Sequence, residues 1–414
     1  MLYYYLFPTI LLTLVQPIYC ELFSSSRWIV DANNQRVKLR CVNWAGHMEV
    51  NLPEGLHHQS IDTITGWIAD NGFNCVRLTY SIDMALDPTV KASDSFSAAA
   101  DPAGVSAPDM ESLYTQALTH NPLLENATRI DVFAAVIDSL HSKGLYTILD
   151  NHVSRASWCC DFKDGNGWWD TAQGYNDLNS RYFNTEKWLQ GLQAMARFAK
   201  SHPGVIGMSL RNELRALPLI QDLNNHNDWY RLIAQAANQV HTENPSLLVI
   251  IGGVNGGTDL SFVRIRPFDT SAWANKHVWE FHAYSFTITN PNPTGSCKVA
   301  SAEYGLFEGF LLTQGKGYTG PLFLSEFGVG MTGGPEENHG IPDKDYKYLK
   351  CLVEYMENND ADWAVWALQG SYYVRDKTVD MDESYGLLTQ DWSGWRNPHF
   401  KDVLGKMMDV TQGP

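Results

Sequence analysis

The sequence predicts an α/β fold, a (β/α)8 TIM barrel with long loop insertions on its top face. Eight short runs of apolar and β-branched residues are spread along the 414-residue chain. Segments with apolar residues at helical spacing separate most of these runs, and this alternation favours a parallel sheet. No Ser/Thr/Pro-rich linker or change of composition divides the chain. We therefore expect one large barrel domain, because this length suits a barrel with insertions.

The strands are expected in chain order at 39–45, 74–80, 145–152, 205–213, 247–253, 277–285, 321–328 and 362–370. Helical spacing is clearest at 130–140, 188–199, 230–240 and 346–356, and it is weakest after the fifth strand. The alternative is an open, doubly wound sheet. That fold normally carries a Gly-rich phosphate turn after its first strand, and Asn-Trp-Ala-Gly-His at 43–47 is not such a turn.

Two long insertions, 81–125 and 153–183, follow the ends of the second and third predicted strands. In a barrel both lie on the C-terminal face, where active sites are built. The first insertion contains an Ala/Ser-rich stretch. It either walls off one end of a substrate cleft or forms a disordered surface loop.

The first twenty residues carry no charged side chain and contain an apolar run. They are typical of a secretory signal peptide, so we expect residues 21–414 to form the mature, secreted domain. An uncleaved membrane anchor is the alternative, but the apolar run is short for a membrane span. Export agrees with a glycosylation sequon at Asn126.

Six cysteines are left if Cys20 is removed with the signal peptide, and an exported chain can pair them as disulfides. We expect disulfides at Cys159, Cys160 and Cys297. Cys41 and Cys75 lie in predicted strands, where either a disulfide or two buried thiols would fit.

A formal net charge of −16 makes the chain a poor partner for nucleic acid or for an anionic membrane surface. The composition instead suits a neutral or cationic ligand. With 14 Trp, 19 Tyr and 17 Phe, the chain has more aromatic residues than a core requires, so some are expected at a binding surface. We expect a monomer.

Two glutamates stand at the ends of different predicted strands. Glu213 ends the fourth strand in the run Ser-Leu-Arg-Asn-Glu, and Glu326 lies near the end of the seventh strand among apolar residues. In a barrel the two side chains converge on the top face. Two carboxyl groups with different pKa values are what glycosidic cleavage needs. Alternatively, each glutamate forms a structural ion pair, Glu213 with Arg211 or Arg215 and Glu326 with Arg77.

Other polar and aromatic residues end the neighbouring strands. His282 and Tyr284 are two residues apart, so they share one face of the sixth strand. Arg77 can hold a carboxylate ionised. Further candidates for the same site are Asn151, His152, Asn212 and Trp366.

These residues, in this order on successive strand ends, resemble glycoside hydrolase family 5, the cellulase family of clan A. The runs Asp-Asn-His-Val-Ser at 150–154, Trp-Cys-Cys at 158–160 and Gly-Ser-Tyr-Tyr at 370–373 are similar to a cellulase-like branch in plants and fungi. The likeness spans nearly the whole mature chain. It implies a retaining glycosidase that uses no metal or organic cofactor.

The resemblance also implies roles for individual residues. Glu213 would be the general acid/base and Glu326 the nucleophile. Asn212 would bond the sugar 2-hydroxyl at the cleavage subsite. The residues that hold the sugar ring or the carboxylates would be Arg77, His152, His282, Tyr284 and Trp366. The role of Asn151 is open, because 150–152 offers two polar candidates. The expected distance between the two carboxyl groups is about 5–5.5 Å.

Flat aromatic rings can bind the apolar faces of sugars. Candidates in or near the top-face loops are Trp44, Trp158, Trp168, Trp169, Tyr372, Tyr373, Trp392 and Trp395, the last expected to serve packing. His47 and Glu54 contact either a glycan or their own loop.

The expected substrate is a β-1,4-glucan or a related β-glycan. The alternatives are an exo-acting enzyme on short glycosides and a non-catalytic glycan-binding cell-wall protein. An esterase would need a Gly-x-Ser-x-Gly elbow, which the sequence lacks.

Overall fold

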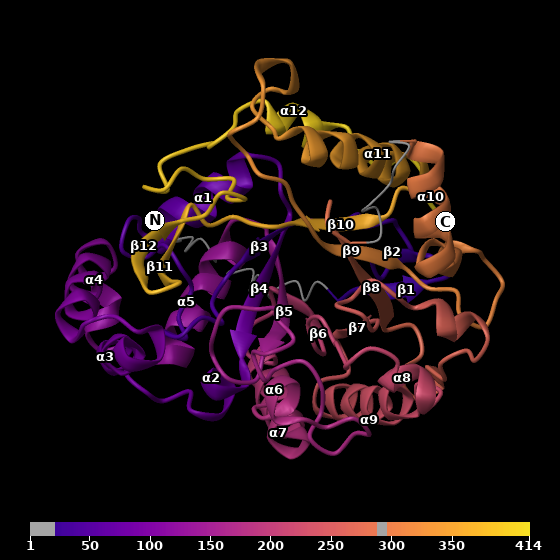
Figure 1. Cartoon of the computed structure of the whole chain (residues 1–414), viewed down its shortest axis with the longest axis horizontal. Helices are drawn as coiled ribbons and strands as arrows, with labels where there is room; N and C mark the ends of the chain where they lie inside the picture. The colour runs from indigo at the N-terminus through magenta and orange to yellow at the C-terminus, as the bar shows by residue number, and fades with distance from the viewer. Residues whose placement is uncertain (1–20, 288–295) are drawn as a thin grey trace, which may run out of the picture.

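The computed structural model describes residues 21–287 and 296–414, and a closed barrel of parallel strands forms its centre (Figure 1). β10 closes the barrel by pairing in parallel with β3. The predicted fold and all eight predicted strands are therefore confirmed. The barrel strands are β3 (Arg40–Trp44), β4 (Cys75–Ser81), β5 (Tyr146–Val153), β6 (Val205–Ser209), β7 (Leu248–Gly252), β8 (His277–Ala283), β9 (Leu322–Phe327) and β10 (Asp362–Val365).

Two of the predicted strands end at least four residues earlier than expected. β6 ends at Ser209 and β10 ends at Val365, so Glu213 and Trp366 lie on the loops that follow these strands. Both residues nevertheless stay on the C-terminal face of the barrel, where loops carry function.

The four predicted helices are present as α5 (Arg129–Ser142), α7 (Thr185–Ala199), α9 (Asn227–Glu243) and α11 (Asp343–Asn359). α5 begins at a capping box in which Thr128 and Asp131 satisfy each other's backbone N–H groups. Between β7 and β8 the described chain forms only the short 3-10 turns η2 (Ser261–Arg264) and η3 (Ser271–Trp273), which explains the weak helical pattern there. The remaining helices are α1 (Ile61–Asp70), α2 (Ile82–Leu86), α3 (Ala92–Ala103), α4 (Ala107–His120), α6 (Asp177–Ser180), α8 (Ile220–Leu223), α10 (Cys297–Phe307) and α12 (Phe400–Gly405), with η1 (Pro122–Glu125), η4 (Gly309–Leu312) and η5 (Glu336–Asn338).

The interior of the barrel changes from apolar to polar along the strands. The N-terminal hairpin of β1 (Phe23–Ser25) and β2 (Trp28–Val30) packs against an apolar layer that includes Cys41, Cys75, Ile148 and Val278. Successive inward-facing residues of a strand are two apart. The next inward positions on the same four strands are therefore polar, and all are buried: Asn43, Arg77, Asp150 and Glu280. This polar layer is the floor of the candidate site.

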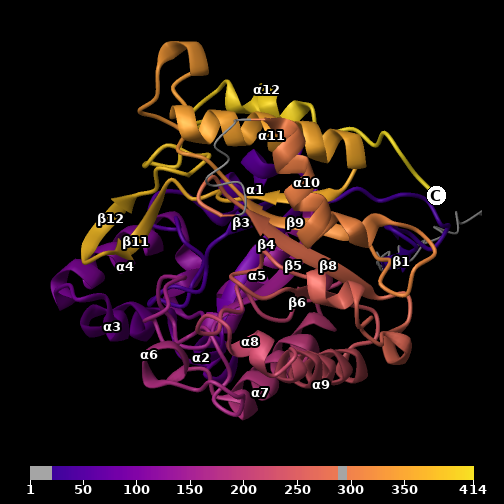
Figure 2. The same cartoon turned by 45° about the vertical axis from the view of Figure 1, so that its right-hand side comes forward.

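The first insertion is helical, not disordered. It forms α2, α3, α4 and η1, and α3 packs against a second hairpin made of β11 (Ser371–Arg375) and β12 (Thr378–Asp382). The rings of Phe96 in α3 and Tyr373 in β11 meet edge to face, with their centroids 4.9 Å apart. Figures 1 and 2 both show α3 and α4 beside this hairpin. The insertion therefore supports the hairpin that borders the site.

The six cysteines of the described region form three disulfides, Cys41–Cys75, Cys159–Cys160 and Cys297–Cys351. The disulfides expected at Cys159, Cys160 and Cys297 are present, and of the two alternatives for Cys41 and Cys75 the structure has the disulfide. The predicted signal peptide, residues 1–20, lies outside the described residues. Within 21–287 and 296–414, no helix is both long enough and apolar enough to cross a membrane.

Candidate active site

Glu213 and Glu326 lie close together at the C-terminal end of the barrel. Glu326 belongs to β9, whereas Glu213 lies on the loop after β6 with φ of 42°. Nδ1 of His282, from β8, is 3.0 Å from Oε1 of Glu213 and 3.6 Å from Oε2 of Glu326. One carboxylate oxygen of each glutamate lies within 4.8 Å of the other. The structure thus brings the two predicted carboxyl groups into one site.

Glu326 is held by two strong donors. Nη1 of Arg77 donates to Oε1 at 2.8 Å, and the hydroxyl of Tyr284 donates to Oε2 at 2.9 Å. Burial raises the pKa of Glu326, while His282 and Arg77 oppose this rise. Hydrogen bonds from a cation and a hydroxyl favour the ionised carboxylate and fix the direction of its oxygens.

Glu213 has a different environment. Burial raises its pKa to about 7, against the opposing charge of Arg215. The ion pair considered for Glu213 does not form within the described residues. Arg215 instead pairs with Asp164 and donates to the backbone carbonyl of Glu213 at 2.8 Å. A carboxyl group with this pKa is protonated in a large share of the molecules at neutral pH.

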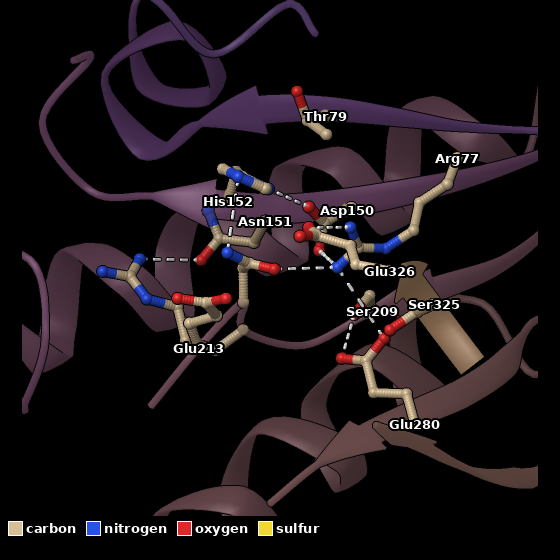
Figure 3. Close-up of polar contacts among 12 residues, drawn as sticks. Arg77, Thr79, Asp150, Asn151, His152, Ser209, Glu213, Glu280, Ser325 and Glu326 are labelled. Atoms are coloured by element: carbon tan, nitrogen blue, oxygen red, sulfur yellow. Dashed lines mark hydrogen bonds and ion pairs between the residues drawn. The ribbon is translucent and has the colours of Figure 1, made fainter. Parts of the chain in front are cut away.

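Arg77 links the nearby carboxylates to one another (Figure 3). Its Nη2 donates to Oδ1 of Asp150 at 2.9 Å and lies 3.8 Å from Oε2 of Glu280. Asp150 in turn lies 2.6 Å from Nδ1 of His152, which orients that ring. Asp150 and Glu280 were not predicted as site residues. They lie two residues after inward-facing apolar residues, and this spacing was the available signal.

A pocket of about 370 Å³ opens above these residues. The predicted binding residues His152, Asn212, Tyr284 and Trp366 line it together with both glutamates. The indole of Trp366 is nearly parallel to the ring of His152, with centroids 5.4 Å apart and 17° between the planes. Arg77 and His282 lie beneath the pocket, where they contact the carboxylates of the two glutamates that line it. The other lining residues are Trp158, Cys159, Cys160, Phe286, Arg375, Met381, Asp382, Glu383, Ser384 and Tyr385.

Comparison with known proteins decides the family. Residues 30–371 match the cellulase model, described as glycosyl hydrolase family 5. The chain belongs to this family. It is therefore a glycoside hydrolase. A glycosyl hydrolase 5 family protein from Chamaecyparis obtusa is 37% identical over 95% of this chain and 67% of its own length. An endoglucanase from Paenibacillus polymyxa is 23% identical over 92% of this chain and 85% of its own.

Solved structures confirm the family 5 fold. The catalytic domain of the major endoglucanase from Xanthomonas campestris pv. campestris superposes with a TM-score of 0.68 at 20% identity, over 94% of this chain and 99% of that one. A complex of an endocellulase from Pyrococcus horikoshii with cellotetraose has the same TM-score at 17% identity, with the same coverage.

Besides Arg77 and His282, two further predicted binding residues of this family 5 chain do not line the pocket. Trp44 is fully buried beside Trp392, and its Nε1 donates to the carbonyl of Glu54 at 2.9 Å, so it belongs to the core. Asn151 is also fully buried, and its Oδ1 accepts a hydrogen bond from Arg211 at 3.0 Å. Asn151 therefore supports the loop, while its neighbour His152 lines the pocket.

Most of the other aromatic candidates also serve packing. Trp168, Trp169, Tyr373 and Trp392 are buried, and Trp395 packs against Trp67 as expected. The two open loop candidates are buried as well. Nδ1 of His47 forms a hydrogen bond with the hydroxyl of Thr79 at 2.6 Å, and Glu54 accepts one from the backbone N–H of Tyr373 at 2.6 Å. Both side chains are therefore engaged by other residues of the protein.

Trp158 does reach the pocket and takes part in a wall along one side of it. The guanidinium of Arg375 lies over its indole, 3.4 Å from the ring centroid, and Tyr372 meets it edge to face at 5.6 Å. Glu383 ties this group together, because it accepts hydrogen bonds from Tyr372 at 2.6 Å and from Arg375 at 3.0 Å. The wall joins the 153–183 loop to the β11–β12 hairpin.

Proposed function

We propose that this family 5 chain is a secreted, monomeric, retaining β-glycosidase in which Glu326 is the nucleophile and Glu213 the general acid/base. The observation that carries the proposal is the pair of carboxyl groups in unlike environments. Their facing oxygens lie within 4.8 Å. Retaining glycosidases place these groups about 5–5.5 Å apart, and inverting enzymes about 6.5–9.5 Å apart.

The contacts of each glutamate support its role. Arg77 and Tyr284 favour the ionised form of Glu326, which attacks the anomeric carbon. Glu213, with a pKa of about 7, gives its proton to the departing glycosidic oxygen. A glycosyl-enzyme ester forms on Glu326. Glu213 then takes a proton from water, the water oxygen attacks the anomeric carbon, and the sugar leaves with its configuration retained.

The proposed substrate is a β-1,4-glucan or a related β-glycan. Several relatives are endoglucanases, and a solved endocellulase of the same fold binds cellotetraose. Exo action on short glycosides is a second candidate, supported by the wall of Trp158 and Arg375. This wall bounds the pocket, and the ordered helices of the 81–125 insertion stand behind it.

Secretion is part of the proposal because the first twenty residues resemble a signal peptide and three disulfides suit an oxidising compartment. A secreted, shortened chain in culture medium would support it, and retention of residues 1–20 would contradict it. Gel filtration tests the monomer.

A pair of alanine variants tests the two catalytic roles. In Glu326→Ala, azide can replace the nucleophile and invert the anomeric carbon once, so a β-glycoside gives an α-glycosyl azide. In Glu213→Ala, azide attacks the glycosyl-enzyme, and two inversions give a β-glycosyl azide. NMR of the products distinguishes these outcomes. The reverse assignment of products would exchange the two roles, and full activity of Glu326→Ala without azide would refute the mechanism.

The same assay fixes the substrate when it covers polymeric and aryl β-glycosides. Products of mixed length from a polymer indicate endo action, and a single short product indicates exo action. Binding of a glycan without cleavage by the unmodified protein would favour the non-catalytic alternative.

A further inference from the structure

The Cys159–Cys160 disulfide joins neighbouring residues and lines the catalytic pocket. Both cysteines are among the pocket residues, next to Trp158. One carboxylate oxygen of Glu213 lies within 4.8 Å of both sulfur atoms. The other two disulfides, Cys41–Cys75 and Cys297–Cys351, are not among the residues that line this pocket. The Cys159–Cys160 disulfide thus lies beside the reacting groups.

The side chain of Asn212 faces this disulfide. Its Oδ1 accepts a hydrogen bond from Arg77 at 3.0 Å, which directs the Nδ2 group to the opposite side. There Nδ2 lies 3.6 Å from the sulfur of Cys159, 3.6 Å from that of Cys160 and 3.3 Å from Nε2 of His152. A sulfur atom is a weak acceptor, and N–H donors prefer about 2.9–3.0 Å to oxygen. A sugar hydroxyl would therefore be a better acceptor than either sulfur atom for the N–H of Asn212 that faces the disulfide.

Arg215 holds the disulfide segment against Asn212. Its Nη1 lies 3.9 Å from the sulfur of Cys159, and its Nε donates to the carbonyl of Asp161 at 3.1 Å. Arg215 is nearly fully buried and also pairs with Asp164. The cross-link and this arginine together fix both sulfur atoms on the Asn212 side of the pocket.

We propose that the Cys159–Cys160 disulfide determines specificity by contacting the sugar at its 2-hydroxyl. The disulfide leaves the N–H of Asn212 that faces it without a strong competing acceptor, and it limits the room around carbon 2. Free thiols or hydroxyls at these positions would bring donors and rotatable acceptors to the same place. The inference rests on the proposed function, in which Asn212 bonds the 2-hydroxyl.

Two substrates isolate this contact: an aryl β-glycoside of the sugar that the enzyme cleaves, and its 2-deoxy counterpart. The ratio of their kcat/KM values measures the contribution of the 2-hydroxyl, which glycosidases use most strongly in the transition state. In Cys159→Ser/Cys160→Ser we expect the ratio to fall by about tenfold, the rate effect of one ordinary hydrogen bond. The double variant Cys297→Ser/Cys351→Ser, which removes a disulfide outside the pocket, should keep the ratio of the unmodified enzyme. A cysteine pair that only supports the fold would change both kcat/KM values by one factor and leave the ratio unchanged.

Reduction provides a second test if the serine variant fails to fold. The unmodified enzyme is treated with a phosphine reductant, the free thiols are alkylated, and mass spectrometry identifies protein opened at Cys159 and Cys160. A lowered ratio in this material supports the proposal. An unchanged ratio in either folded, cross-link-free form overturns it. If Glu326→Ala gives no azide product and the unmodified enzyme cleaves neither glycoside, the proposed function itself fails.

Discussion

Replacing Glu213 with glutamine should stabilise the folded protein at neutral pH while it removes catalysis. Burial raises the pKa of Glu213 from 4.5 to about 7, so the folded protein binds this proton more tightly than the unfolded chain does. Stability therefore falls as the pH rises from 4.5 to 7, because the unfolded chain loses its proton first. Glutamine does not titrate, so the variant avoids this loss.

The magnitude follows from the shift in pKa. A shift of roughly 2.5 units at about 1.36 kcal/mol per unit gives an upper value of about 3.4 kcal/mol. The side chain of Glu213 is 21% exposed, and water reaching it reduces the gain to about 2 kcal/mol. We thus expect Glu213→Gln to match the unmodified protein near pH 4.5 and to exceed its free energy of unfolding at pH 8.

Urea unfolding at pH 4.5, 6 and 8, with pH 3 added for the control below, is followed by tryptophan fluorescence and measures these differences. Glu243→Gln is a control of opposite sign. Hydrogen bonds from Arg197 and Lys200 lower the pKa of Glu243 to about 2, so its variant should be less stable at pH 7, and the deficit should shrink as the pH falls from 4.5 toward 2. A Glu213→Gln protein that gains no stability between pH 4.5 and pH 8 would refute the reasoning. The same pKa predicts that kcat/KM falls above pH 7, as Glu213 loses its proton.

Two further substitutions test the charges beneath the pocket and the wall beside it. Arg77→Met leaves Asp150 and Glu326 without their buried cation, so urea unfolding at pH 7 should show a loss of about 3–5 kcal/mol together with a fall in kcat/KM; an unchanged urea midpoint would contradict this. Trp158→Ala removes the ring on which Arg375 rests, so cleavage of polymeric β-glucan should rise relative to an aryl glycoside. Equal effects on both substrates would show that the wall does not limit chain length.

The sequence was sufficient to predict the barrel and most of the site because strand ends in a barrel converge. It did not identify Asp150 and Glu280, although each lies two residues after an inward-facing apolar residue, as Arg77 does after Cys75. Both polar residues lie inside strands that the sequence predicts from their apolar residues, so the strand pattern gives them no separate signal. Their role depends on contacts with Arg77 between strands that are distant in sequence, and a single-strand pattern does not contain such contacts.

The same alternation explains why two of the predicted binding residues do not line the pocket. Asn43 and Asp150 point into the barrel, so the residues that follow them, Trp44 and Asn151, point outward. Trp44 accordingly packs in the outer core, and Asn151 bonds Arg211. His152 is two residues after Asp150 and faces the pocket. Strand parity therefore distinguishes the two polar candidates at 151 and 152, a question that residue type alone left open.

Parity alone would nevertheless exclude Glu326, the proposed nucleophile. Phe323 belongs to the inner cluster of the barrel and Leu324 to the outer one, so strict alternation turns Ser325 inward and Glu326 outward. The pairing of β8 with β9 shifts at this point, since Phe281 pairs with Leu324 and His282 pairs with Glu326. Ser325 is the extra residue of this irregularity, and β-bulges re-aim side chains next to active sites. The shift places Glu326 opposite His282 and within reach of Arg77 and Tyr284. The geometry of the proposed catalytic pair therefore depends on a one-residue departure from regular strand pairing.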